Sequence, residues 1–299
     1  MTREKYLSEL KSELRSLPDA EQVEALEYFK GYFEDADNDD EVMASLGTPQ
    51  ELAKTILERF VSVPEIYRPR ENQDGHGSYG SFKDSEVRSL DISIGAAEAV
   101  ITTGDSYSVE YKNMEAGDIT VGLSGLGTLS IRNNATYRNF TFWMRKNNSE
   151  KVPPRILIKV PEDAKLDLFK VNLGAGMLTS SNLRVRAEKI NLNVGAGNLV
   201  LDKVFGGSGK VSCGMGNLEY TGTISGRVAA DCGMGKLQMN LTGKESDYSF
   251  AASVGLGSVQ FNKIQKNGIG KLSCSEKKPN HIEASCGMGL VKIDMRETV

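Results

Sequence analysis

A short glycine-centred motif recurs along the C-terminal part of this chain and constrains its fold more than any other feature. The six copies read NLGAGMLTS from Asn172, NVGAGNLVL from Asn193, SCGMGNLEY from Ser212, DCGMGKLQM from Asp231, SVGLGSVQF from Ser253 and SCGMGLVKI from Ser285. Their first glycines follow one another at steps of 21, 19, 19, 22 and 32 residues. A period near twenty residues is typical of a solenoid, in which each repeat forms one coil and stacks on the next. The motif is therefore expected to build the fold.

Apolar residues alternate with other residues before each motif, and only Gly209 in the third copy breaks the series. They stand five, three and one residues ahead of the first glycine, as Phe169, Val171 and Leu173 do before Gly174. This spacing predicts a strand with one buried face. The buried positions resume after the motif at an odd step, at Leu178, Leu199, Leu218, Leu237, Val259 and Val291. Strict alternation cannot change phase in this way, so each copy is expected to mark a bend between two strands.

The two glycines of the motif suggest how the bend is made. We expect the second glycine to sit at a corner or bulge, where backbone freedom near positive φ is useful. We also expect the residue between the glycines to stack inside the coil. These residues are Ala175, Ala196, Met215, Met234, Leu256 and Met288.

Stacked coils of this kind pair their strands in parallel ladders. LDISIGAAEA from Leu90 and SGLGTLSI from Ser124 look like degenerate earlier copies, so the β region is expected to begin near Glu86. The long step of 32 residues predicts an inserted turn or hairpin around Lys277 to Asn280. The open ends of a solenoid need protection, which a folded-over helical domain or a second molecule would supply.

The first sixty residues have a helical pattern instead. Apolar residues recur at steps of three and four from Tyr6 to Leu17 and again from Val23 to Phe33. The sequence from Thr48 to Glu51 is a capping box with proline at the first helical position, which predicts a last helix from Pro49 to Phe60. Gly47 is expected to end a short helix before it.

These patterns predict α and β structure in separate domains. Residues 1–60 form a small helical bundle, residues 61–85 a polar linker, and residues 86–299 an all-β parallel solenoid (a β-helix or β-roll) with coils of about twenty residues. The linker assignment rests on prolines and on the tract NQDGHGSYGS.

Charge is distributed unevenly along the chain. Residues 1–60 hold 15 acidic and 7 basic residues, a net charge of −8. This excludes a nucleic-acid-binding N-terminal domain and suits either a solvated helical surface or contact with a basic protein partner. The acidic tract from Glu34 to Glu41 fails as a calcium-binding loop, because Asp40 and Leu46 stand where glycine and glutamate are required. An acidic helix N-terminus is the better interpretation.

The sequence offers no enzyme signature, and we expect neither a cofactor nor a metal. The four cysteines, Cys213, Cys232, Cys274 and Cys286, form no CxxC motif. Three of them stand where sister copies have leucine or valine, so they are interpreted as reduced, buried apolar residues. No phosphate-binding loop, HExxH or GxSxG motif occurs. Outward acidic residues such as Glu219 and Asp231 do not recur as a row of catalytic carboxylates.

One stretch outside the repeat, Ala135 to Arg155, combines aromatic and basic residues. It contains the only tryptophan and five basic residues beside one acid. We consider it a candidate surface-binding patch for an anionic surface, lipid headgroup or glycan, or else a hairpin that covers the solenoid. The candidate residues are Trp143, Phe140, Phe142, Arg138, Arg145 and Lys146.

Both halves of the chain resemble bacterial families. YLSELKSELRSLP and SLGTPQELAKTI resemble the HAAS helical domain, which is often encoded beside PadR-type transcription regulators. NLGAG, NVGAGNLVLDKV and VPEDAKLDL resemble the putative-adhesin β-solenoid family of Gram-positive envelope-associated proteins. Relatives often carry a membrane helix between the two parts, where this chain has a polar stretch. Neither family supplies a catalytic motif.

The resemblance and the regular architecture imply a non-enzymatic, adhesin-like interaction or scaffold protein. Its solenoid would bind an envelope polymer or an anionic lipid surface, its acidic helical domain a protein partner, and a solenoid end a second copy. The alternative is a cytoplasmic regulatory or sensor module of an envelope-stress response that acts through the helical domain. A carbohydrate-active enzyme on a β-helix would need the missing carboxylate cluster. Without a signal peptide or an apolar run of about 18 residues, we expect a cytoplasmic or peripherally envelope-associated protein.

Overall fold

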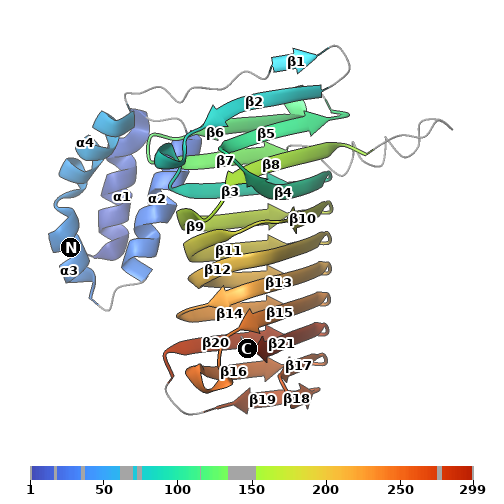
Figure 1. Ribbon diagram of the computed structural model, residues 1–299. Helices are drawn as coiled ribbons and strands as arrows, with labels where there is room; N and C mark the ends of the chain where they lie inside the picture. Colours follow the sequence, from blue (N-terminus) through green and yellow to red (C-terminus); the bar gives the residue numbers. More distant parts are fainter. Residues whose placement is uncertain are drawn as a thin grey trace. The chain divides into compact units, whose positions relative to one another are not determined.

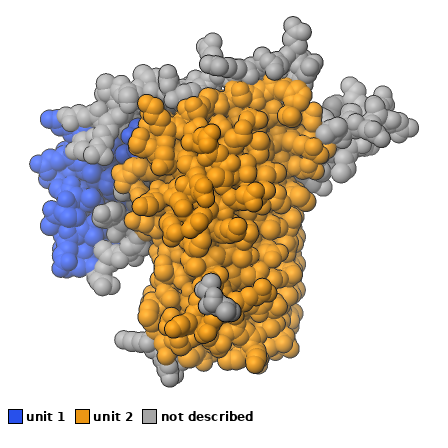
Figure 2. Space-filling view, viewed as in Figure 1, with its two compact units in different colours: residues 1–65, 124–126 blue, residues 66–123, 127–299 orange. Residues whose placement is uncertain are grey.

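The computed structural model describes residues 2–16, 19–34, 38–60, 70–72, 76–114, 116–133, 153–274 and 278–297. The chain divides into two compact units (Figure 2). The helical unit comprises Met1–Glu65 with Ser124–Leu126, and the β unit comprises Ile66–Leu123 with Gly127–Val299. The expectation of a small helical region followed by a large, mostly β region is confirmed.

The helical unit contains four α-helices among its described residues. They are α1 (Arg3–Glu13), α2 (Asp19–Glu34), α3 (Asp39–Leu46) and α4 (Pro49–Phe60), with a 3₁₀ turn, η1 (Leu14–Ser16), after α1. The predicted capping box at α4 is confirmed, because the Glu51 carboxylate accepts a hydrogen bond from the Thr48 backbone N–H at 2.9 Å and Glu51 N–H donates to Thr48 Oγ1 at 3.2 Å. Gly47 ends α3 with a φ of 77°, as expected.

The core of the helical unit lies where the helical spacing predicts it. Tyr6 and Phe33 pack edge to face with ring centroids 5.6 Å apart, and the Tyr6 hydroxyl donates to the carbonyl of Gly47 at 2.9 Å. Val23, expected on the same apolar face, is 55% exposed. The acidic tract also behaves as expected where it is described. Asn38 caps α3, and Asp39, Asp40 and Glu41 occupy its first turn.

The β unit is built from many short strands (Figure 1). Its first strands are β1 (Arg70–Asn72), β2 (His76–Phe82), β3 (Ser89–Ile94), β4 (Glu98–Gly104), β5 (Tyr107–Lys112), β6 (Ile119–Leu123), β7 (Thr128–Asn133), β8 (Arg155–Pro161), β9 (Ala164–Leu173), β10 (Met177–Ser181) and β11 (Val185–Val194). The others are β12 (Asn198–Cys213), β13 (Asn217–Ile224), β14 (Arg227–Cys232), β15 (Lys236–Thr242), β16 (Tyr248–Val254), β17 (Ser258–Phe261), β18 (Ile264–Asn267), β19 (Gly270–Ser273), β20 (Asn280–Cys286) and β21 (Leu290–Arg296). The 3₁₀ turns η2 (Asp84–Glu86), η3 (Ala116–Asp118) and η4 (Glu245–Asp247) connect some of them.

Strands that precede a motif pair with one another, and strands that follow a motif do the same. The residue before the first glycine shows the register. Leu173 pairs with Val194, Val194 with Cys213, and Cys213 with Cys232, all in parallel. After the motif, Leu199 pairs with Leu218 and Leu218 with Leu237. The side chains at these positions are buried, so the apolar alternation read from the sequence does mark the core.

The order of the strands departs from the order of the chain near the C-terminal end. β20 lies between β14 and β16, and β21 lies between β15 and β17. The chain therefore passes over one position, forms β16 and β17, and later returns to fill the gap. β8 is placed similarly, between β4 and β5.

Antiparallel strands close the two ends of the stack. β18 pairs with β17, and β19 pairs with β16, so this inserted segment, which we call the closing segment (Ile264–Ser273), covers the last bend. The long step also contains the turn expected around Lys277 to Asn280, because β19 runs antiparallel and β20 parallel to β16. Lys277 itself lies outside the described residues. At the other end, β5 pairs with β8, β2 with β5, and β6 with β7. The pairings at both ends of the stack are thus antiparallel pairings within the β unit. Protection of these ends by the helical domain or by a second molecule stays a prediction.

The predicted linker is partly wrong. His76–Phe82 forms β2, and its aromatic residues Tyr79 and Phe82 are buried in the β core. The Tyr79 hydroxyl donates to the carbonyl of Ile119 at 2.7 Å. The glycines and serines around these aromatics have a linker-like composition, but two buried rings are enough to hold a short strand against β5.

Candidate functional site

The six residues of the predicted aromatic and basic patch lie outside the described residues. Trp143, Phe140, Phe142, Arg138, Arg145 and Lys146 all fall within 134–152. That patch therefore stays a prediction. The described residues offer another candidate site, the edge of the β unit at which the glycine motifs align. This edge, which we call the bend edge, comprises residues 95–97, 174–176, 195–197, 214–216, 233–235, 287–289 and 255–257.

Backbone hydrogen bonds stack these bends directly on one another. The N–H of Met215 donates to the carbonyl of Gly195, and the N–H of Met234 donates to the carbonyl of Gly214, each at 2.8 Å. The N–H of Met288 then donates to the carbonyl of Gly233 at 2.8 Å. The ladder of the flanking strands thus continues around the bend without leaving these backbone groups unpaired.

The second glycine is required by space and not by positive φ, so the expected reason for it was wrong. None of the second glycines has a φ in the left-handed region. A Cβ at Gly235 would lie within 3.0 Å of the carbonyl oxygen of Gly216 and 3.0 Å from Cys213 Sγ. A Cβ at Gly289 would likewise lie within 3.0 Å of the carbonyl oxygen of Gly235 and of Cys232 Sγ. Each second glycine therefore allows one bend to lie against the backbone and the buried side chain of the next.

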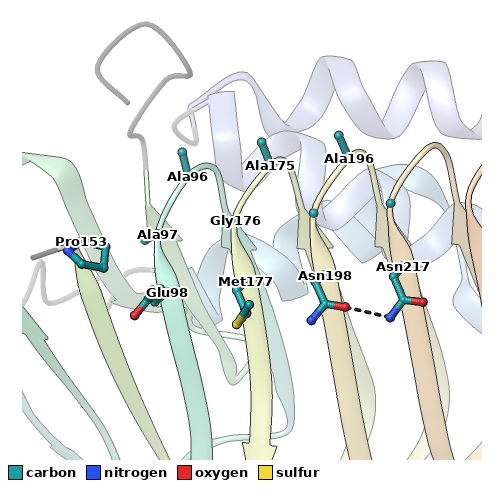
Figure 3. Close-up of a pocket in the computed structure, with 12 residues that line it drawn as sticks. Ala96, Ala97, Glu98, Pro153, Ala175, Gly176, Met177, Ala196, Asn198 and Asn217 are labelled. Carbon is teal, nitrogen blue, oxygen red and sulfur yellow. Dashed lines mark hydrogen bonds between the residues drawn. The ribbon is translucent and has the colours of Figure 1, made fainter. Parts of the chain in front are cut away.

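The residues between the glycines point outward, which overturns the expectation that they stack inside. Met215, Met234, Met288 and Leu256 are 63%, 55%, 59% and 72% exposed. Alternation between inside and outside holds only while a strand is extended, and the chain bends at these three residues. The residue at the apex of the bend is therefore directed away from the core. Figure 3 shows this for Ala175 and Ala196, which lie at the tops of successive bends.

A shallow groove lies beside the alanine end of the bend edge. It has a volume of about 510 Å³, and Glu98, Pro153, Met177, Asn198 and Asn217 contribute to its lining (Figure 3). The Asn217 side-chain amide donates to Asn198 Oδ1 at 2.8 Å, across two neighbouring strands. Glu98 pairs with Arg155 at 3.2 Å. The groove therefore combines apolar backbone bends with amide groups that hydrogen-bond each other.

Beneath the bend edge, cysteines align on the buried side of neighbouring strands. Cys213 pairs in register with Cys232, and Cys232 with Cys286, and all three are free thiols and buried. The thiols of Cys213 and Cys232 each donate to the carbonyl three residues ahead at 3.2 Å. Interaction between these two thiols lowers the pKa of Cys213 and raises that of Cys232, while burial raises the pKa of Cys286. They fill the positions held by leucine and valine in sister copies, as expected.

Acidic and metal-binding groups do not converge within the described part of the chain. Asp231 pairs with Lys210 at 3.2 Å, and Glu219 accepts a hydrogen bond from the Asn240 amide at 3.1 Å. Among the described residues, no group of three or more His, Cys, Asp or Glu side chains is placed to hold a metal ion. No helix in those same residues is long and apolar enough to cross a membrane.

Sequence reasoning missed the exposed apolar residues of the bend edge. The signal was present, because apolar residues occupy the middle motif position in all six copies. It was misread, because alternation alone assigns that position to the core. The count of residues between Leu173 and Leu178, or between any equivalent pair, leaves room for a bend with an outward apex.

The fold and the bend edge define a protein with a small helical region and a large β-solenoid-like domain. Comparison with protein families matches residues 5–55 to HAAS and residues 87–240 to Toastrack DUF4097. The chain belongs to the Toastrack DUF4097 family and carries a HAAS domain at its N-terminus. No curated protein matches the sequence significantly.

Solved structures with a similar arrangement share little sequence with this chain. A "putative cell adhesion protein" from Clostridium sporogenes is 18% identical, with a TM-score of 0.43, over 77% of this chain and 100% of that one. A "putative adhesin" from Bacteroides fragilis is 14% identical, with a TM-score of 0.47, over 73% of this chain and 95% of that one. A "putative lipid binding protein" from Parabacteroides distasonis is 15% identical, with a TM-score of 0.39, over the same shares.

Proposed function

We propose that this protein is a non-enzymatic, adhesin-like interaction protein that binds an envelope or surface component through the bend edge of its β unit. The observation that carries the proposal is the set of large apolar side chains exposed at equivalent bends, Met215, Met234, Met288 and Leu256. Apolar side chains that are exposed together on one surface often mark an interaction site, whereas single exposed apolar residues are common on any protein surface. Here a regular backbone ladder holds them in line.

The scaffold in this proposal is a parallel solenoid with coils of about twenty residues. The pairing of Leu173 with Val194 and of Val194 with Cys213 supports it, because these partners are 21 and 19 residues apart. A cytoplasmic or peripheral location at the envelope is part of the proposal. So are binding of a protein partner by the acidic helical unit and contact between copies through an end of the β unit.

The test is binding of the full chain to envelope fractions of Gram-positive cells, with membranes and cell-wall polymer kept separate. Wild-type protein is expected to sediment with one of the two fractions. The variant with Met215→Gln, Met234→Gln and Met288→Gln is expected to stay in the supernatant. Val23→Gln is the matched control, because Val23 is 55% exposed but lies in the helical unit.

Two outcomes would contradict the proposal. The first is wild-type protein that sediments with neither membranes nor cell-wall polymer, because the proposed envelope partner would then be missing. Equal sedimentation of the triple variant would move binding away from the bend edge. Capture of a transcription regulator by the full chain, without envelope binding, would support the regulatory alternative.

A further inference from the structure

The exposed apolar residues continue past the last motif onto the closing segment. The N–H of Gly268 donates to the carbonyl of Gly257 at 3.0 Å, while Ser258 pairs with Asn267 and Val254 with Gly270. The bend between β18 and β19 therefore lies on the last motif bend as one further rung. Its apex residue, Ile269, is 80% exposed.

Five large apolar side chains consequently occupy five successive rungs. In spatial order this apolar row consists of Met215, Met234, Met288, Leu256 and Ile269. This order differs from the sequence order, because the bend of Met288 lies between those of Met234 and Leu256. With neighbouring strands about 4.8 Å apart, the row is about 19 Å long. The fold thus brings together five residues from separate segments, and all five side chains are large and apolar.

The borders of the apolar row are polar except at Leu290, and their unpaired charges are positive. On the side that precedes the bends lie Ser212, Asp231, Ser285, Ser253 and Lys271. On the side that follows lie Asn217, Lys236, Leu290, Ser258 and Asn267. Asp231 is neutralised by Lys210 at 3.2 Å. Among the described residues of these borders, Lys236 and Lys271 are exposed and form no ion pair.

The shape of the row favours a deformable partner over a rigid one. The row is one residue wide, and each of its residues stands at the apex of a tight bend. The surface around the row is therefore convex across the row at every rung. A stable protein interface buries about 800 Å² on each partner across a closely fitted surface, which a single convex row does not offer. A lipid layer closes around such a row without needing a matching groove.

We propose that the apolar row inserts into the interfacial region of an anionic phospholipid bilayer, with Lys236 and Lys271 beside the headgroups. The inference rests on the proposed function and names its partner. Apolar side chains buried at the boundary between headgroups and acyl chains supply affinity, and lysines near the surface add attraction to anionic lipid. Methionine suits this position because its flexible thioether adapts to an irregular apolar environment.

The test is flotation of the full chain with vesicles of phosphatidylcholine alone and with vesicles that contain phosphatidylglycerol. Wild-type protein and Val23→Gln are expected to float with the anionic vesicles. The triple methionine-to-glutamine variant is expected to lose about tenfold or more in partition coefficient. Lys236→Gln and Lys271→Gln are each expected to lose about fivefold, and added salt should weaken wild-type binding. Circular dichroism confirms that each variant keeps its fold.

Several results would overturn the inference. One is equal flotation of the triple variant and wild-type protein. Another is vesicle binding that is equally strong with and without phosphatidylglycerol and that neither lysine substitution weakens. A dimer in solution that the triple variant abolishes, without vesicle binding, would make the row an interface between copies. Binding to cell-wall polymer but not to vesicles would refute the lipid partner and leave the proposed function standing.

Discussion

At the scale of single residues, the glycine motif works through the absence of a side chain. Gly235 lies against the carbonyl of Gly216 and the Cys213 thiol, and a Cβ would overlap both. The cysteine is small enough to fill the inside of the bend while the next glycine passes over it. The outward methionine is free of these contacts. One motif therefore supplies both a close backbone contact, at its second glycine, and an exposed apolar side chain, at its middle residue.

Gly235→Ala is expected to destabilise the β unit by about 3 kcal/mol, because a closely packed bend has to move to make room for the added carbon. Gly122→Ala in β6 is the matched control, since no atom lies within 4 Å of a Cβ built there. Urea unfolding followed by circular dichroism measures both variants. Equal stability of the two would show that the bends are loosely packed.

At the scale of elements, the last helix of the helical unit depends on its capping box. The Glu51 carboxylate accepts hydrogen bonds from the backbone N–H and the hydroxyl of Thr48, both at 2.9 Å. The backbone hydrogen bond is the larger cause that lowers the pKa of Glu51 from its ordinary value of 4.5. A lowered pKa means that the folded state favours the ionised carboxylate.

The contribution of Glu51 to stability should accordingly depend on pH. It is present above pH 4.5, where the carboxylate is ionised in both states, and is lost as the pH falls through the lowered pKa of the folded state. Thermal unfolding of the helices should therefore occur at lower temperature in Glu51→Ala than in wild type at pH 7. The difference should shrink below pH 4.5. A difference that stays constant to pH 3 would contradict this role.

At the scale of the whole molecule, the last two strands of the chain occupy an internal position in the stack. β20 and β21 each pair with two parallel neighbours. In a simple solenoid the terminal repeat contacts only one neighbour, and its loss is local. Here the connection from Thr242 to Tyr248, which carries η4, spans the place that β20 and β21 later fill.

Removal of residues 280–299 should therefore cost more than one coil. β16 and β17 lose their parallel partners, so β16 to β19 are expected to detach and become sensitive to protease around Glu245 to Asp247. Removal of residues 297–299 is the control and should leave the protein resistant. Limited proteolysis with mass spectrometry identifies the cleavage sites. A resistant 1–279 chain would show that the gap closes without β20 and β21.

The sequence by itself determined the two regions, the helix boundaries at Gly47 and Pro49, and the buried faces of the strands. Each of these follows from local rules of capping and periodicity, which do not depend on distant segments. The direction of Met215 and Met234 was decided by the tertiary structure, because a bend reverses the alternation that a straight strand obeys.

The tertiary structure also decided the order of the strands and the existence of the apolar row. Met288 lies beside Met234 only because β20 and β21 fill an earlier gap, and Ile269 joins the row only because the closing segment covers the last bend. Such contacts join residues that are distant in sequence, so the periodicity of the sequence does not predict them. They depend on which unpaired strand edge each segment meets as the molecule folds.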